Sequence, residues 1–352
     1  MSEFLKEYMN SYGPTGFEYE IGSQKVWMKN IKKYSNKVEV DNYGTCYAEM
    51  GNEKSDFSVV IEAHCDEISY FVNYIDEKGY IKVIRNGGSD HQIAPSMRVI
   101  LWSEEKGPIN GIFGHPAIHI KDRAKEITLD TIFIDVGASS RDDVIKMGIN
   151  IGTVVTLNAE MMELGENYYT GRSFDNRMGG FIISEVARKI KENNIKLPYK
   201  LYVVNSVQEE IGLKGAEMIA QRLKPNVAIV TDVCHETSSP AYNPVKHGHF
   251  IAGEGGVITT APAVHNKLKR LVIETAKDNE LKFQLSASSR ATGTDTESFA
   301  YQNGGTPSVL ISLPLKYMHT TVETVHKDDI QSVIDMIYQT LLKIEENHDF
   351  KY

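Results

Sequence analysis

The sequence predicts an α/β protein with a mostly parallel sheet flanked by helices and a small all-β, barrel-like domain inserted into it. Two observations support this fold class. Helix-like and strand-like segments alternate near the start and throughout the second half of the chain, as in layered α/β folds. Between about residues 69 and 167, short β-rich segments are separated by glycine-containing turns without a long helical pattern, as in a small barrel or sandwich.

The first part of the chain has the pattern of two helices followed by strands. Apolar residues recur at helical spacing in residues 2–10 and 18–34, and the GPTG between these segments is typical of a turn. Residues 37–51 predict a β-hairpin. Residues 57–64, FSVVIEAH, predict a buried strand because branched apolar residues dominate them.

Helices and strands alternate again after residue 167. Helices are expected at residues 178–193, 213–223, 266–279 and 327–347, and strands at residues 200–207, 227–233 and 307–314. Such alternation is typical of a mostly parallel sheet. We therefore expect a discontinuous α/β domain formed by residues 1–68 and 168–352, with residues 69–167 as the inserted β-rich domain.

Composition and charge exclude several classes of protein. The 352 residues are 41% hydrophobic, which suffices for a sizeable core, and the net charge of -9 argues against binding to nucleic acid or an anionic membrane. No apolar run approaches the roughly 20 residues of a membrane span. The N-terminus lacks a secretory pattern, and the cysteines, Cys46, Cys65 and Cys234, are too scattered for a disulfide framework. We expect a cytoplasmic, reduced protein.

Metal-capable side chains stand where predicted strands end. In open α/β sheets, active sites lie beyond the carboxyl ends of the strands. The side chains at such ends are His64 and Asp66, Glu209 and Glu210, Asp232, and His319, and Asp175 lies in a loop that opens a helix. Four strands thus deliver these groups to the same edge of the predicted sheet.

The types of these side chains favour a metal site. Two imidazoles with three carboxylates suit zinc, cobalt or manganese better than calcium. Five ligands exceed one tetrahedral site and fit two metals about 3.5 to 4 Å apart that share a carboxylate. A further carboxylate would remain free as a base. Taken singly, each group is more often a cap or a surface charge, and adjacent acids such as EE usually mark a solvated turn. The joint pattern favours the metal site.

The cysteines and glycine-rich stretches give weaker signals. Cys65 alternates away from its two neighbours and is expected in the core. Cys234 could approach the site, although a core position is favoured. The HGH at residues 247–249 is interpreted as a loop. No GxSxG elbow, P-loop or dinucleotide motif occurs.

Several motifs together resemble those of the M42 metallo-aminopeptidases, which form tetrahedral particles and act on peptides. The matching stretches run in the family's order over nearly the whole chain: GPTGFE, AHCDEI, GRSFDNRMGG, VQEEIGLKGA, IVTDV, GTDTESF and PLKYMHTTVE. The resemblance implies the same split architecture, with the inserted domain used in assembly of dimers into a dodecamer.

The resemblance also implies a ligand set for two divalent metal ions, with zinc favoured over cobalt or manganese. Asp175 would bridge the two ions. One ion would also be held by His64 and Asp232, and the other by Glu210 and His319. These roles are carried over from the family's motifs to the matching positions of this chain.

Two further carboxylates receive roles from the resemblance. Glu209 would be the general base, and Asp66 would orient His64, as carboxylates commonly do for metal-bound imidazoles. The implied reaction is hydrolysis of N-terminal residues from short peptides with a free N-terminus, with a metal-bridging water as nucleophile. In the doublet, Glu209 would thus carry protons and Glu210 would bind metal.

Some positions depart from the commoner family pattern. Asn176 follows the bridging aspartate where many relatives carry a second Asp, Lys316 stands where Arg is frequent, and GEGG at residues 253–256 replaces a more usual GKGP. These differences leave the expected metal ligands unchanged. They leave the preferred N-terminal residue of the substrate open.

Other functions compete with the aminopeptidase hypothesis. A deacylase could use the same metal centre on a non-peptide amide. A glycoside hydrolase needs two carboxylates and no metal, which would leave the histidines idle. An inactive assembly protein could discard ligands, yet all seven expected positions are filled. The filled positions favour an enzyme.

Overall fold

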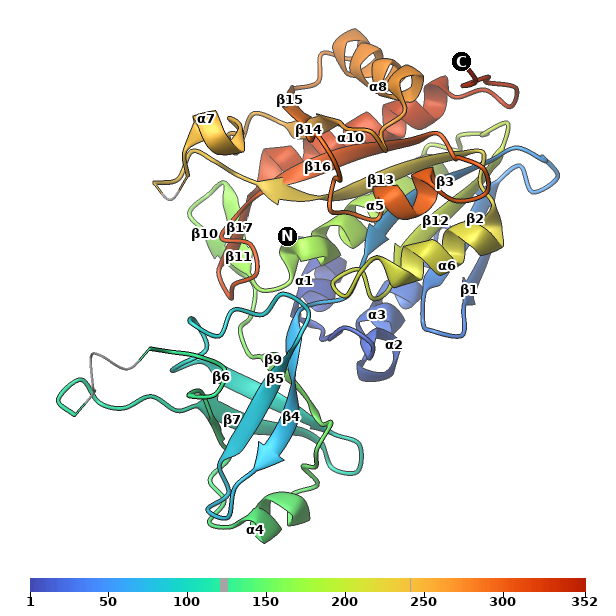
Figure 1. The fold of residues 1–352 in the computed structure, drawn as a ribbon. Helices are drawn as coiled ribbons and strands as arrows, with labels where there is room; N and C mark the ends of the chain where they lie inside the picture. The colour runs from blue at the N-terminus through green and yellow to red at the C-terminus, as the bar shows by residue number, and fades with distance from the viewer. Residues whose placement is uncertain (121–125, 241) are drawn as a thin grey trace.

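A computed structural model describes residues 1–120, 126–240 and 242–352 of the protein and shows two bodies. A layered α/β body contains a mixed sheet, and a closed β-barrel projects from it (Figure 1). Each body has its own cluster of buried apolar side chains. The predicted fold class is therefore confirmed. None of the described helices is long and apolar enough to cross a membrane.

The large sheet has a parallel centre and antiparallel flanks. Its neighbouring strands run in the order β1 (Lys37–Val40), β2 (Cys46–Gly51), β12 (Lys200–Ser206), β3 (Ser58–His64), β13 (Val227–His235), β16 (Ser308–Lys316), β17 (Glu323–His326), β11 (Tyr168–Gly171) and β10 (Met162–Leu164). Strands β12, β3, β13 and β16 are parallel to their neighbours in this group. All residues of β3 are buried, as expected for a central strand covered on both faces. Strand β14 (Gly256–Thr260) pairs with β16 and with β15 (Phe283–Ala287).

Helices cover both faces of this sheet. Helix α5 (Phe174–Glu192) packs across β3 and β13, and α1 (Glu3–Asn10), α3 (Ser23–Ile31) and α10 (Lys327–Lys343) pack against α5. Helix α6 (Lys214–Leu223) and the short α9 (Thr296–Ala300) lie on the opposite face (Figure 1). These layers enclose the main core.

Two further helices lie outside these layers. Helix α8 (Asn266–Asp278) packs against α10 and β14, and α7 (Pro244–His247) follows β13 in the chain.

The single helix predicted over residues 18–34 is wrong in one respect. The structure has two helices there, α2 (Glu18–Ile21) and α3, separated by Gly22. The φ angle of Gly22 is 139°, a conformation that side chains with a Cβ rarely adopt, so the helix cannot continue through it. The break lets α3 turn its buried face, including Trp27, toward α5.

The barrel is built from the short strands between β3 and β10. They are β4 (Ser69–Ile75), β5 (Ile81–Asn86), β6 (Arg98–Ser103), β7 (Gly107–Phe113), β8 (Ile134–Asp135) and β9 (Val154–Leu157), which close in the order β4-β5-β8-β7-β6-β9. The pairs are antiparallel, and α4 (Arg141–Lys146) lies at one end (Figure 1). The domain boundaries at residues 68 and 167, and the use of the barrel in assembly, stay predictions.

Candidate metal centre

The metal-capable side chains converge at the carboxyl edge of the parallel strands. His64 is the last residue of β3, and Asp232 lies within β13. Glu209 and Glu210 follow β12, His319 follows β16, and Asp175 lies in the non-helical stretch at the start of α5. Six of the seven residues that the sequence predicted line one cleft of about 860 Å³: His64, Asp175, Glu209, Glu210, Asp232 and His319. The seventh, Asp66, is buried beneath it.

Six of these side chains form two adjoining groups. The strand-side cluster comprises His64, Glu209 and Asp232, and the loop-side cluster comprises Asp175, Glu210 and His319. Within each cluster, one potential ligand atom per residue lies within 4.8 Å of the others. Each cluster therefore offers three converging donors, which is enough to begin a metal site.

Asp175 belongs to the loop-side cluster and also contacts the strand-side cluster. Its Oδ1 atom is 3.2 Å from His64 Nε2, and its Oδ2 atom is 3.3 Å from His319 Nε2. Glu210 Oε1 is also 3.3 Å from His319 Nε2. Donors that share one tetrahedral zinc at about 2.0 to 2.1 Å lie about 3.3 Å apart. The spacing around Asp175 fits a carboxylate with one oxygen for each of two ions.

The strand-side cluster is slightly wider. His64 Nε2 is 3.8 Å from both Asp232 Oδ1 and Glu209 Oε2. Glu209 thus stands as close to His64 as Asp232 does, so distance alone allows it to be either a ligand or a base. The role of Glu209 as base stays a prediction.

The charges of the cleft favour a bound cation. Burial raises the pKa of Glu209 to about 10, and burial likewise raises the pKa of Asp232, with the charge of Asp175 adding to the effect. Burial lowers the pKa of His319, but hydrogen bonds to Asp175 and Glu210 outweigh it and raise that pKa to about 11. With only two imidazoles beside four carboxyl groups, the ionised forms of these buried acids are disfavoured. A divalent cation supplies the missing positive charge and fits this donor set.

Asp66 contacts the backbone of the glutamate doublet in addition to the His64 imidazole that the sequence predicted as its partner. Its Oδ1 atom lies 3.2 Å from His64 Nδ1, which agrees with the predicted contact. The same oxygen accepts the Glu209 N–H at 3.0 Å, and Oδ2 accepts the Glu210 N–H at 3.2 Å. Asp66 therefore fixes the backbone of the glutamate doublet as well as contacting the histidine, and the sequence did not reveal this second contact.

Asn176 has a contact that explains why an amide is useful at this position. Residues Asp175 and Asn176 have non-helical backbone angles at the start of α5, and the peptide bond between them is cis. The Asn176 Nδ2 atom donates to the carbonyl of Thr231 at 2.8 Å, one residue before Asp232. An ionised Asp could not donate this bond. The amide thus ties the Asp175 loop to β13.

Sequence reasoning missed a buried ionic network beside the cleft. Glu67 accepts hydrogen bonds from Arg172, from Ser173 Oγ at 2.6 Å and from the Gly13 N–H at 2.8 Å. Burial raises the pKa of Glu67, but Arg172 and Arg177 outweigh burial and lower it below the usual value. The network joins the end of β3 to the loop that carries Asp175. The signal was present in the sequence as charged residues inside the AHCDE and GRSFDNR motifs.

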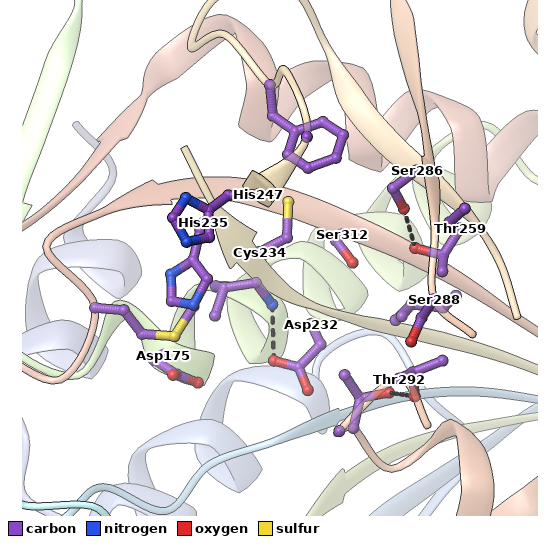
Figure 2. Close-up of a pocket in the computed structure, with 18 of the residues that line it drawn as sticks. Asp175, Asp232, Cys234, His235, His247, Thr259, Ser286, Ser288, Thr292 and Ser312 are labelled. Carbon is purple, nitrogen blue, oxygen red and sulfur yellow. Dashed lines mark hydrogen bonds between the residues drawn. The ribbon is translucent and has the colours of Figure 1, made fainter. Parts of the chain in front are cut away.

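The outer walls of the cleft differ in chemistry. One wall carries basic groups, and the opposite wall carries hydroxyl groups (Figure 2). His235 and His247 lie on one side, and Thr259, Ser286, Ser288 and Thr292 lie on the other (Figure 2). Lys246, His249 and Ser312 also line the cleft. The HGH segment at residues 247–249 therefore lines the cleft. Its interpretation as a loop did not predict this position.

The two cysteines near the centre lie in different surroundings. Cys65 is fully buried, as predicted. Cys234 is only partly buried and lines the cleft, so the core position favoured for it is wrong. The reason is that β13 runs to His235 and brings its last residues past the metal-capable groups.

Known proteins resemble the chain over nearly its whole length. A family model described as M42 glutamyl aminopeptidase matches residues 44–336. The lysyl aminopeptidase of Pyrococcus furiosus is 31% identical over 340 residues, which cover 95% of this chain and 94% of that protein. The TET aminopeptidase of a marine sediment Thaumarchaeota archaeon superposes with a TM-score of 0.91 at 27% identity, covering 97% and 96% of the two chains. The structure of PhTET1-12s, a dodecamer in the asymmetric unit, gives 0.83 at 25% identity, covering 96% and 98%.

Proposed function

The chain belongs to the M42 family of aminopeptidases and is a peptidase, and on that premise we propose that it removes N-terminal residues from short peptides at a centre of two divalent metal ions. The observation that carries the proposal is the position of Asp175, whose two oxygens face His64 and His319 in adjoining clusters. His64 and Asp232 would complete one ion's ligands, and Glu210 and His319 the other's.

The protein's own groups would orient the substrate and move its protons. Divalent metal ions at such a site supply Lewis-acid chemistry, which makes a water molecule more acidic and polarises a carbonyl group. Glu209 Oε2 lies 3.8 Å from His64 Nε2 and would take the proton of the attacking water. The same carboxyl group would return that proton to the nitrogen of the leaving amine.

The acidic floor of the cleft would select peptide ends. A free α-ammonium group is attracted to crowded carboxylates, whereas an acetylated nitrogen or an internal peptide bond offers no such charge. Four acidic side chains line the floor: Asp175, Glu209, Glu210 and Asp232. This asymmetry supports an exopeptidase over an endopeptidase.

Self-association is part of the proposal. PhTET1-12s is a dodecamer, and it shares the fold of this chain over most of its length. The barrel of this chain exposes Ile84 on β5 and Ile112 on β7. Exposed apolar side chains on a small barrel support its use as an assembly surface, with dimers building a dodecamer.

The test is hydrolysis of aminoacyl reporters, free and N-acetylated, before and after treatment with a chelator and after restoration of Zn²⁺, Co²⁺ or Mn²⁺. We expect cleavage of the free-amine reporters only, lost with chelator and regained with metal. Chelator-sensitive cleavage of the acetylated reporters would instead support a deacylase or endopeptidase. Activity that survives metal removal would contradict the metal centre itself.

A further inference from the structure

Two of the expected ligands stand outside the strands and need another support. Asp175 lies in a non-helical stretch at the start of α5. His319 follows β16 and has a left-handed φ of 61°, which costs an L-residue free energy. The ladders of the sheet therefore do not fix either residue. Something else must hold the two loops at the spacing of the loop-side cluster.

A single buried carboxylate contacts both loops. Glu323, the first residue of β17, is only 2% exposed. Its Oε2 atom accepts the N–H groups of Phe174 at 2.7 Å and Asp175 at 3.2 Å. Its Oε1 atom accepts the N–H of His319 at 2.8 Å. The two oxygens of one side chain thus bind the backbones of two loops that are far apart in the sequence.

The position of Glu323 also meets a need of helix α5. The first N–H groups of a helix lack partners within it, and here the non-helical angles of Asp175 and Asn176 interrupt the helix directly after Phe174. Ser173 stands at the N-cap but makes no capping hydrogen bond with its side chain. Glu323 supplies the missing acceptor for the first two residues of α5. Glu323 thus accepts backbone N–H groups through both oxygens: those of Phe174 and Asp175 at Oε2, and that of His319 at Oε1.

We infer that Glu323 is a positioning residue that sets the separation of Asp175 and His319 and so preorganises the loop-side cluster for its metal ion. The inference rests on the metal centre of the proposed function. It assigns Glu323 no contact with metal or substrate, because its oxygens are occupied by backbone N–H groups.

A second buried carboxylate provides a matched control. Asp329 in α10 is fully buried and accepts the N–H groups of Gly253 at 2.8 Å and Gly255 at 2.7 Å. Like Glu323, Asp329 accepts hydrogen bonds from backbone N–H groups, but the loop that donates them carries no expected metal ligand. Asp329→Asn therefore reproduces the loss of a buried acceptor without touching either cluster.

The first experiment is titration of metal-stripped protein with Zn²⁺ by calorimetry, with metal content measured after buffer exchange. The wild-type chain should bind two ions, and His319→Ala identifies the event that belongs to the loop-side cluster. In Glu323→Gln an amide N–H₂ faces a backbone N–H, so we expect the loop-side affinity to fall by about 10 to 100-fold, as for other residues that orient ligands. The strand-side affinity should change much less, and Asp329→Asn should change neither.

The outcomes separate this inference from the proposed function. Wild-type protein that binds fewer than two ions would overturn the dinuclear centre, and the role of Glu323 with it. Two ions in the wild type, with Glu323→Gln affinities unchanged or equally reduced at both sites, would overturn the positioning role alone. A merely structural role would lower thermal stability in both carboxylate variants without separating the two metal affinities.

A second measurement tests the positioning role of Glu323 even if the Glu323→Gln variant does not fold. Hydrogen exchange in metal-stripped wild-type protein should already be slow at the amides of Phe174, Asp175 and His319, because a buried carboxylate accepts them without metal. Rapid exchange at these amides that slows only after Zn²⁺ is added would show that the metal, and not Glu323, orders the loops.

Discussion

The two halves of the metal centre are held by different kinds of interaction. In the strand-side cluster, His64 and Asp232 lie in β3 and β13, which are paired in parallel with Glu62 opposite Val230. Each ligand is two residues beyond that pair, so the register of the sheet brings both to the same edge and the same face. In the loop-side cluster, Asp175, Glu210 and His319 all lie outside regular strands.

Burial differs between the two imidazoles in the same sense. The side chain of His64 is 1% exposed, whereas that of His319 is 31% exposed. Ligands carried by strands share the stability of the whole core, whereas ligands carried by loops depend on a few hydrogen bonds to buried carboxylates. We therefore expect single substitutions to disturb the loop-side cluster selectively more often than the strand-side cluster.

The largest effect is expected where the two halves meet. Asp175→Asn removes a charged oxygen from the residue that contacts both clusters. Lewis-acid stabilisation is worth several kcal/mol, so we expect hydrolysis to fall by on the order of a thousand-fold or more, with loss of both ions. Rates of reporter hydrolysis and metal content per chain check this result. Retention of both ions at wild-type affinity would contradict the bridging position.

The next effect separates chemistry from metal binding. Glu209→Gln should lower the rate constant kcat by about 100 to 10,000-fold, the contribution of a general acid–base group, while both ions stay bound. Metal analysis of the purified variant is the deciding measurement, because Glu209 is as near to His64 as Asp232 is. Loss of one ion in this variant would make Glu209 a strand-side ligand instead.

A smaller and unselective effect is expected at Asp66. Its two oxygens contact His64 and the N–H groups of both glutamates, so it serves a member of each cluster. Asp66→Asn should weaken both metal affinities by about 10 to 100-fold. Zinc titration should therefore give a pattern unlike that of Glu323→Gln. Selective loss of one ion would show that Asp66 serves only one half of the centre.

The smallest effect is expected at Cys65, which lies between two important residues but is buried away from the cleft. Burial raises the pKa of its thiol, so the thiolate form that binds metal is disfavoured. Cys65→Ala should cost about 1 kcal/mol of unfolding free energy and leave both metal affinities unchanged. Denaturant unfolding and zinc titration test both parts. Loss of an ion would indicate that the strand end is less rigid than the ladder predicts.

Much of the fold followed from local patterns. Branched apolar runs gave β3, β12, β13 and β16, and helical periodicity gave α5, α8 and α10 within a few residues. The short strands β10, β11, β14, β15 and β17 were not predicted. These five strands have three to five residues and carry little periodicity of their own, and each is stabilised by pairing with a neighbouring strand.

The sequence by itself determined which residue types stand at the ends of the buried strands, and this was enough to predict the six side chains that line the cleft floor. Only the tertiary structure decided that Glu323 reaches two loops, that Asp66 binds the backbone of the glutamate doublet, and that the HGH segment borders the cleft. The physical reason is the range of the interactions. Periodicity reports burial over a few neighbouring residues, whereas a side chain that accepts N–H groups from distant loops depends on distances that exist only after the chain has folded.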